Sequence, residues 1–369
     1  MQFSIHPKIS DCESLNAFFD QWQVGGQDLM ITNEYVVSPH LSGKALPCEV
    51  LYQEKYGAAA EPNDEMIDAM LDAVRGKPFS RIIAIGGGTV IDIAKLFVFG
   101  EGYRCEEIFA KGAQLERKRK LIIIPTTCGT GSEVTGISIV EFKKKHTKLG
   151  LAVPALFADE AVLIPAMLST LPYQVFATSS IDALIHSVES FVSPKANALT
   201  KAVGRASIER ILEGYQAIAA TGERALPRDM TPFLLASTMG GIAFGNAGCA
   251  AVHALSYPLG ANYHIPHGKA NYMVFEAVFQ MYKELGADLS LLEKLLSTVL
   301  ACDAAAVWHD LFGLLEKILP NQPLSAVGAD SEKCAEMARS VIENQQRLLV
   351  NNPIPLSEGQ INRIYQRCL

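Results

Sequence analysis

Apolar and polar residues follow different patterns in the two halves of this 369-residue chain. The first half contains short runs that are apolar on both faces, separated by segments with helical spacing: DLMIT (28–32), RIIAIG (81–86), KLIIIP (120–125), KLGLAV (148–153) and AVLIP (161–165). Strands of this kind, alternating with helices, are typical of a mostly parallel sheet covered on both faces. We therefore predict an N-terminal, Rossmann-like α/β domain.

The second half repeats apolar residues every three or four positions over long segments, as in residues 199–220 and 331–350. This spacing is that of amphipathic helices and predicts an all-α C-terminal domain. The segment TLPYQVFATSS (170–180) contains the Pro and the Ser/Thr caps expected where two domains meet. The predicted boundary separates residues 1–177 from residues 178–369.

Composition narrows the classes of function. The chain is 49% hydrophobic and 19% charged, its net charge is −7, and its basic run at residues 143–145 is short, so no nucleic-acid partner is expected. No apolar stretch reaches the roughly 18 residues of a membrane span, and the N-terminus lacks a secretion signal. The eight cysteines form no CxxC pair, which favours reduced thiols and a cytoplasmic location.

Two loops rich in small residues follow predicted strands. In RIIAIGGGTVIDIAK (81–95), Gly86, Gly87 and Gly88 separate a strand from a helix that begins at about Thr89. IIIPTTCGTGSEVT (122–135) repeats the arrangement with Thr, Gly and Ser. Glycine lets a ligand approach the backbone, a helix N-terminus attracts phosphate, and loops after parallel strands share one sheet edge. The loops predict a nucleotide site; tight strand–helix packing and an ordinary helix cap are the alternatives.

A second group of residues has the chemistry of a metal site. SSIDALIHSVESFVS (179–193) is predicted as a helix capped by Ser179 or Ser180, with Asp182 and His186 four residues apart on one face. A carboxylate and an imidazole in this arrangement can hold one ion. Taken alone, a simple hydrogen bond between the two is the commoner explanation.

The stretch HALSYPLGANYHIPHGKAN (253–271) adds two histidines. His253 closes an apolar helix predicted over residues 240–255, where an imidazole without a partner would be costly to bury. His267 stands between Pro and Gly, where its ring can point back to that helix. A Lewis-acidic ion can polarise a carbonyl, and a bound nicotinamide can exchange hydride with the same carbon, so the two together predict alcohol–aldehyde interconversion. The four N and O ligands suit divalent Fe, Zn or Co: Asp182, His186, His253 and His267.

The motifs GGGTVIDIAK, PTTCGTGSEVT, SSIDALIHSVESFVS and HALSYPLGANYHIPHGKAN, in this order, resemble those of the iron-containing, group III alcohol dehydrogenases. The resemblance covers nearly the whole chain and ends at the Asn-Pro of NNP (351–353). It implies the fold shared with dehydroquinate synthase, NAD and Fe2+ or Zn2+ as cofactors, a small-molecule substrate, and a homodimer that the N-terminal run MQFSI would join as an edge strand. Details such as YQEKYG, FGNAG and QQRLLVNN are most similar to the branch that interconverts succinate semialdehyde and 4-hydroxybutyrate.

The resemblance also assigns residues by position. The family's metal ligands fall on the quartet already reached from spacing. Its pyrophosphate contacts fall on Gly87, Gly88 and Thr89, with Asp92 beside them. Its contacts on the nicotinamide side fall on Thr126, Thr127 and Thr130, and a lysine that contacts the nucleotide falls on Lys148.

This sequence departs from the family at two places. Many relatives carry a further histidine four residues after the third ligand, whereas this chain has Tyr257, so the proton route would use His264, water or the phenol itself. Many NAD-using relatives carry an Asp that meets the adenosine ribose, whereas this chain has Asn33 followed by Glu34. Because Glu34 can replace that carboxylate, NAD is expected rather than NADP.

A four-carbon hydroxy acid needs a cation for its carboxylate, and Lys269 and Arg347 are candidates, with solvated surface charge as the alternative. Three other functions are open. The first is a primary alcohol, diol or glycerol dehydrogenase of the same fold. The second is a cyclase of the dehydroquinate synthase type, which the scarcity of Lys and Arg near the quartet disfavours. The third is a nucleotide-binding regulator or scaffold, which the intact ligands disfavour.

Overall fold

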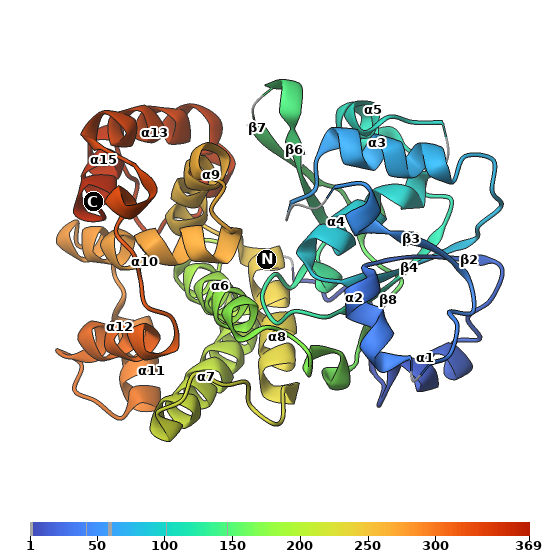
Figure 1. Cartoon of the computed structure of the whole chain (residues 1–369). Helices are drawn as coiled ribbons and strands as arrows, with labels where there is room; N and C mark the ends of the chain where they lie inside the picture. Colours follow the sequence, from blue (N-terminus) through green and yellow to red (C-terminus); the bar gives the residue numbers. More distant parts are fainter. Residues whose placement is uncertain (1–2, 42, 58–60, 101, 146) are drawn as a thin grey trace. The chain divides into compact units, whose positions relative to one another are not determined.

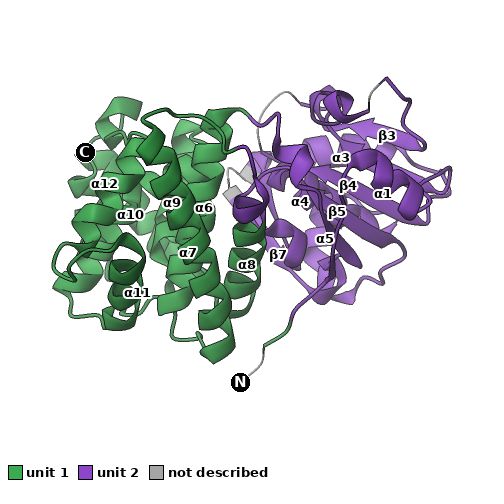
Figure 2. Cartoon of the chain, turned by 90° about the horizontal axis from the view of Figure 1, so that it is seen from below, with its two compact units in different colours: residues 1–4, 172–227, 235–369 green, residues 5–171, 228–234 purple. Residues whose placement is uncertain are grey.

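The computed structural model describes residues 3–369 except 42, 58–60, 101 and 146. The chain forms two compact units (Figure 2), which we call the α/β unit (Ile5–Leu171 and Arg228–Leu234) and the helical unit (mainly Pro172–Pro227 and Leu235–Leu369). The division falls before Pro172, whereas the sequence pattern places it at 177/178. The first helix of the helical unit, α6 (Tyr173–Val192), already begins there.

The main sheet of the α/β unit has six parallel strands in the order β1-β8-β5-β4-β2-β3, which confirms the predicted fold class (Figure 1). The predicted limits of β2, β4 and β5 coincide with those observed. The central strands are apolar on both faces and fully buried, so each Ile or Leu contributes roughly 1.5–3 kcal/mol of burial. The strands are β1 (Lys8–Asp11), β2 (Asp28–Thr32), β3 (Glu49–Tyr52), β4 (Arg81–Gly86), β5 (Lys120–Pro125) and β8 (Glu160–Leu163).

The predicted strand at residues 148–153 was wrongly assigned to this sheet. It forms β7 (Thr147–Ala152), which pairs antiparallel with β6 (Ile137–Phe142) in a separate two-stranded sheet. The physical reason is alternation: every second residue of β6 is buried, whereas the central strands β4 and β5 are buried at every residue after the first. The helices of this unit are α1 (Leu15–Gln21), α2 (Glu34–Val37), α3 (Asp64–Ala73), α4 (Gly88–Leu96) and α5 (Cys105–Lys111).

The second half is helical, as predicted. The predicted helix at residues 331–350 is divided at Gln345, and α6 begins earlier than predicted. The Ser179 and Ser180 hydroxyls do not cap α6; they donate to the carbonyls of Phe176 and Ala177 inside it. The helices are α7 (Ala198–Thr221), α8 (Thr231–Ala247), α9 (Ala251–Tyr263), α10 (His267–Glu284), α11 (Ser290–Leu300), α12 (Val307–Ile318), α13 (Ser331–Asn344), α14 (Gln346–Leu349) and α15 (Glu358–Arg367).

The single helix predicted over residues 240–255 is wrong, because the chain breaks between α8 and α9. Gly248 has φ +81°, and a Cβ there would lie 2.4 Å from the Asn351 side-chain nitrogen, which donates to the Cys249 carbonyl at 2.8 Å. Only glycine fits this position. No single helix in the described part of the chain is long and apolar enough to cross a membrane; α8 and α9 together have the length and composition but bend by 105° at the break.

Candidate metal centre and nucleotide loops

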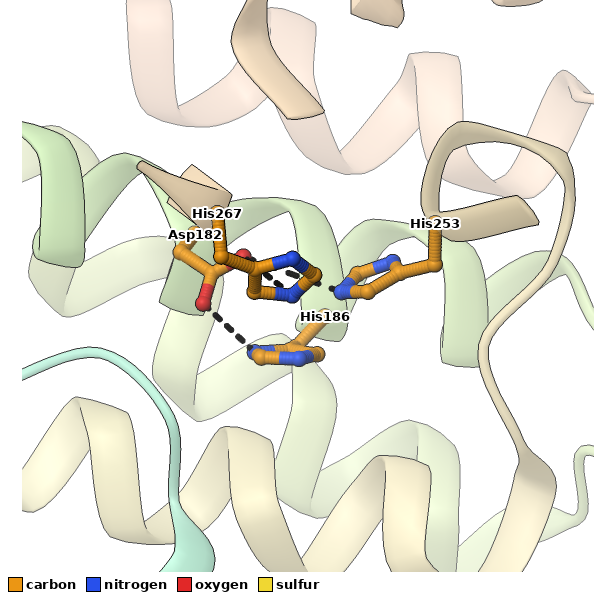
Figure 3. A group of neighbouring side chains, drawn as sticks. All are labelled: Asp182, His186, His253 and His267. Carbon is orange, nitrogen blue, oxygen red and sulfur yellow. Dashed lines mark ion pairs between the residues drawn. The ribbon is translucent and has the colours of Figure 1, made fainter. Parts of the chain in front are cut away.

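Three helices of the helical unit bring the four predicted metal ligands together. Asp182 and His186 lie one turn apart on α6, His253 lies in the first turn of α9, and His267 is the first residue of α10. One ligand atom from each residue lies within 4.8 Å of all the others. Figure 3 shows the three imidazole rings gathered around the Asp182 carboxylate.

The spacing of these atoms fits a shared ion better than direct hydrogen bonds. The Asp182 oxygens lie 3.9 Å from His186 Nδ1, 3.7 Å from His253 Nε2 and 3.8 Å from His267 Nε2. These separations exceed hydrogen-bond lengths. Ligands bound to one ion at about 2.1 Å in a tetrahedron would be about 3.4 Å apart, so small side-chain adjustments would let all four bind. The donor set therefore fits a divalent transition metal.

Burial differs among the ligands in a way that matters for chemistry. The side chains of Asp182, His186 and His253 are at most 6% exposed, whereas that of His267 is 34% exposed. The His186 ring is stacked between Phe244 and His253, at centroid distances of 4.3 and 4.4 Å. The centre is therefore enclosed by protein at three ligands and accessible near His267, where a substrate oxygen could approach the ion as a fifth ligand.

The charges of the centre support one another. Burial would raise the pKa of Asp182, but the three imidazoles and an amide hydrogen bond from Asn271 outweigh it and hold that pKa below its usual value. Burial lowers the pKa of His253, but Cys249 and Glu189 together raise it well above the usual value. The lowered pKa of Asp182 favours its carboxylate form, the form in which it can bind a metal.

Two supporting residues were missed by sequence reasoning. Glu189 accepts a hydrogen bond from His253 Nδ1 at 2.6 Å, and Asn271 donates to Asp182 Oδ1 at 2.6 Å and contacts His267 Nε2 at 3.2 Å. Both are fully buried. Helical spacing offered a signal, since Glu189 follows Asp182 by seven residues and Asn271 follows His267 by four.

A glycine sets the distance between two of the helices. A Cβ on Gly268 would lie 2.3 Å from the Thr178 carbonyl oxygen and 3.2 Å from Asp182 Cβ. The first turn of α10 therefore packs directly on the backbone of α6. This close contact brings His267 to Asp182.

The four predicted catalytic residues lie at different places. The Tyr257 ring is 6.0 Å from the His267 ring, and burial raises the pKa of its phenol, against the opposing electrostatic effect of the Arg347 guanidinium. Lys269 instead donates to Gln322 at 2.7 Å. His264 is exposed and ends α9 with φ +53°. The structure thus places Tyr257 beside a metal ligand and the exposed Arg347 near Tyr257, and it pairs Lys269 with Gln322.

The two predicted nucleotide loops follow neighbouring strands, because β4 pairs with β5 and Gly86 lies opposite Pro125. The Thr126 amide donates to the Gly86 carbonyl at 3.0 Å. A Cβ on Gly88 would lie 2.8 Å from the Thr130 methyl, and a Cβ on Gly87 would lie 3.1 Å from that of Thr127. Glycine therefore lets the loops touch, with Gly87, Gly88 and Thr89 partly exposed at the start of α4.

A buried polar network connects these loops to β6. Lys95 Nζ donates to Ser132 Oγ at 2.8 Å, to Thr135 Oγ1 at 3.2 Å and to the Ile137 carbonyl at 2.6 Å. The Asp92 carboxylate accepts from Ser132 Oγ at 2.6 Å and from the Ile139 amide at 2.9 Å. Burial lowers the pKa of Lys95 to about 8. Asp92, expected beside the cofactor, is thus engaged in holding the second loop.

The remaining predicted nucleotide contacts also have protein partners. Lys148 on β7 forms an ion pair with Glu61. Asn33 is buried at the N-terminus of α2, and its amide donates to Glu54 at 2.8 Å. The exposed Glu34 donates its backbone N–H to the same carboxylate at 2.7 Å. Glu54, which sequence reasoning missed, therefore places a second carboxylate where the ribose was expected.

Comparison with known proteins gives consistent matches along the chain. Residues 23–165 match the family described as iron-containing alcohol dehydrogenase, and residues 176–369 match the C-terminal region of the Fe-containing alcohol dehydrogenase family. The chain is 42% identical over 363 residues to 4-hydroxybutyrate dehydrogenase of Clostridium kluyveri, covering 98% of each protein. It is 31% identical over 324 residues to long-chain-alcohol dehydrogenase 1 of Geobacillus thermodenitrificans, covering 83% of this chain and 79% of the other.

A solved structure extends the comparison to the fold. The sulfoacetaldehyde reductase of Bifidobacterium kashiwanohense in complex with NAD+ aligns with a TM-score of 0.86 at 19% identity, covering 100% of this chain and 98% of the other. At this identity, the similarity establishes a common fold.

Proposed function

We propose that this chain, which belongs to the iron-containing alcohol dehydrogenase family, is an NAD-dependent dehydrogenase that interconverts succinate semialdehyde and 4-hydroxybutyrate. The observation that carries the reaction class is the cluster of Asp182, His186, His253 and His267, which has one accessible side. The substrate is inferred from the Clostridium kluyveri relative. The reduction consumes the semialdehyde, NADH and a proton and yields the hydroxy acid and NAD+.

The quartet is proposed to hold Fe2+, with Zn2+ as the alternative ion. When bound, the ion would polarise the carbonyl oxygen and stabilise the negative charge that develops on it. The protein holds Asp182 ionised with Asn271 and fixes the His186 ring by stacking. The preorganised ligands would therefore need little rearrangement during the reaction.

Nucleotide binding is assigned to the loops that follow β4 and β5. The N-terminus of α4 would receive the pyrophosphate, and Gly87 and Gly88 would allow its close approach. Thr126, Thr127 and Thr130 lie in the second loop. The Glu54 carboxylate beside Asn33 and Glu34 supports NAD, because it would repel a 2′-phosphate.

We assign the substrate carboxylate to Arg347 and the proton to Tyr257. Arg347 has a planar guanidinium suited to a carboxylate and is near enough to lower the pKa of Tyr257, which neighbours the His267 ring. Because burial raises the pKa of Tyr257, its phenol stays protonated at neutral pH and suits proton donation during reduction. Arg347→Met should raise KM for succinate semialdehyde at least tenfold more than KM for butyraldehyde, as an order-of-magnitude estimate. Lys269→Met is the matched control, and equal effects on both aldehydes would refute the assignment.

We further propose a cytoplasmic homodimer. Met1 and Gln2 of the predicted edge strand lie outside the described residues, and residues 3–5 form no strand within the single described chain. Ser4 exchanges two hydrogen bonds of 2.9 Å with the Asn246 side chain, and the next residue, Ile5, is 53% exposed, so an apolar side chain is available for a partner subunit. Light scattering coupled to gel filtration measures the mass; a monomer at micromolar concentration would exclude the dimer.

The decisive experiment is anaerobic NADH oxidation by Fe(II)-reconstituted protein, with succinate semialdehyde beside butyraldehyde, acetaldehyde and dihydroxyacetone. Strong preference for the semialdehyde is the expected result. Preference for a neutral carbonyl would keep the reaction class and remove the proposed substrate. Binding of NADH without turnover of any carbonyl compound would favour a nucleotide-binding scaffold instead.

A further inference from the structure

Glu189 is a buried carboxylate beside the proposed metal centre, and three donors converge on it. Its Oε1 accepts from the Val252 amide at 2.6 Å; its Oε2 accepts from the Ala250 amide at 3.0 Å and contacts His253 Nδ1 at 2.6 Å. The residue is fully buried, on the same helix as Asp182 and His186. A buried carboxylate of this kind needs several partners, and here each oxygen has at least one.

Two of these three groups are backbone amides, which can donate a hydrogen bond but cannot accept one. The Ala250 and Val252 amides open α9, whose N-cap residue, Ala250, has no side chain able to cap it. Backbone N–H groups only donate, so Glu189 must present an acceptor on both oxygens and replaces the missing cap from another helix. In its carboxylate form Glu189 can only accept, so the 2.6 Å contact at Oε2 then requires a donor at His253 Nδ1.

This requirement determines the other nitrogen of the ring. With the proton on Nδ1, the neutral imidazole presents a lone pair at Nε2. That atom is buried, makes no hydrogen bond to any described residue, and lies 3.7 Å from Asp182 Oδ1. The Cys249 thiol shares this corner, but a weak S–H group does not replace a carboxylate as the acceptor for the Nδ1 proton.

We propose that Glu189 is the positioning residue of the metal centre: by accepting from the first turn of α9 and from His253 Nδ1 together, it fixes the orientation and tautomer in which Nε2 faces the ion. The inference rests on the proposed metal-dependent function. One carboxylate would thus both cap α9 and orient a ligand of the metal centre. Loss of such an outer carboxylate typically lowers metal affinity by about 10–100-fold.

Glu189→Gln is the informative substitution, because it conserves shape and removes one acceptor. Its amide nitrogen must face either Val252 N–H or the pair formed by Ala250 N–H and His253 Nδ1. In the first orientation the cap is broken; in the second, His253 must also change its tautomer. Both orientations disturb the His253 ring.

The experiment measures Zn2+ affinity by chelator competition for the full-length wild type, Glu189→Gln and Tyr365→Phe. The Tyr365 hydroxyl donates to the Leu255 carbonyl of α9 at 2.6 Å, so its removal weakens the same helix without touching a ligand or its partner. We expect Glu189→Gln to lose about 10–100-fold in Zn2+ affinity and Tyr365→Phe to lose less than about threefold, although both unfold more easily. Equal Zn2+ affinity of Glu189→Gln and wild type would overturn the inference.

A second measurement needs no variant that folds poorly. In the Zn2+-loaded wild type, nitrogen NMR of labelled histidines should show the His253 proton on Nδ1; a proton on Nε2 would overturn the inference. Failure of the wild type to bind Zn2+ at all would instead remove the metal centre itself. The two failures are therefore distinguishable.

Discussion

The candidate metal centre is built from side chains, whereas the candidate nucleotide loops offer mainly their backbone. In the helical unit, four side chains from α6, α9 and α10 converge, and Glu189 and Asn271 orient them. In the α/β unit, the loops offer backbone, and the charged side chains beside them, Asp92 and Lys95, are used to hold the loops. Substitutions at the metal centre and substitutions beside the nucleotide loops should therefore have different effects on turnover, Zn2+ affinity and NADH affinity.

The sharpest test removes one ligand from the side-chain site. His267→Ala should lower the rate of semialdehyde reduction by roughly a thousandfold, because the polarising ion loses a ligand beside the open position. NADH affinity, measured by fluorescence titration, should change less than about threefold, since the loops belong to the other unit. His309→Ala, at an exposed histidine of α12, is the matched control. Comparable loss of NADH binding and turnover would contradict the separation of the two sites.

The reciprocal test breaks the support of the backbone site. Lys95→Met should destabilise the protein by about 3–5 kcal/mol, because Asp92 loses its buried partner. The second loop should also bind NADH more weakly, while Zn2+ affinity of the folded protein stays unchanged. Urea unfolding and NADH titration measure these effects, with the exposed Lys118→Met as control. Unchanged NADH affinity would mean that the loop holds its shape without Lys95.

A third test asks whether backbone contact also matters in the helical unit. Gly268→Ala would place a methyl group 2.3 Å from the Thr178 carbonyl oxygen, which must force α10 away from α6. We expect a loss of about 1–3 kcal/mol in the free energy of unfolding and about tenfold in Zn2+ affinity. Gly313→Ala has open space inside α12 and should stabilise the protein by about 0.5–1 kcal/mol. Gly268→Ala with wild-type Zn2+ affinity would show that the centre tolerates displacement of α10.

The smallest expected effect concerns nucleotide specificity. Glu54→Gln should raise the ratio of kcat/KM with NADPH to kcat/KM with NADH by about threefold to tenfold, because one carboxylate no longer repels the 2′-phosphate. Glu34→Gln is the comparison, since that side chain is exposed. A larger change in Glu34→Gln than in Glu54→Gln would assign the ribose to Glu34.

Features that depend on residues close together in the chain could be predicted from the sequence. Buried strands such as β4 and the i, i+4 pair of Asp182 and His186 are local patterns of this kind. The break at Gly248 could not be predicted in this way, because it depends on Asn351, far away in the chain. Helical spacing puts Glu189 on the same face as Asp182, but its partners, the Ala250 and Val252 amides, lie more than 60 positions later in the chain, so its role was not visible from the local pattern.

The nucleotide region shows a second limit. Glycine spacing predicted where the loops lie, and the neighbouring strands β4 and β5 supply the reason. The use of Asp92 was not visible, because a carboxylate near a cofactor motif has the same sequence whether it contacts the ligand or Ser132. Spacing predicts proximity, whereas the direction of a side chain depends on packing partners.

The contact between Gly248 and Asn351 also orders events during synthesis. The turn that leads into the helix of His253 is tied by a residue 102 positions later than Cys249. A ribosome adding about 5–20 residues per second needs several seconds to deliver that residue. Once His267 has been added, the nascent chain contains all four candidate ligands, but it lacks the hydrogen bond at this turn until Asn351 follows. Metal loading at this centre should therefore follow translation of the C-terminal segment, late in the life of the nascent chain.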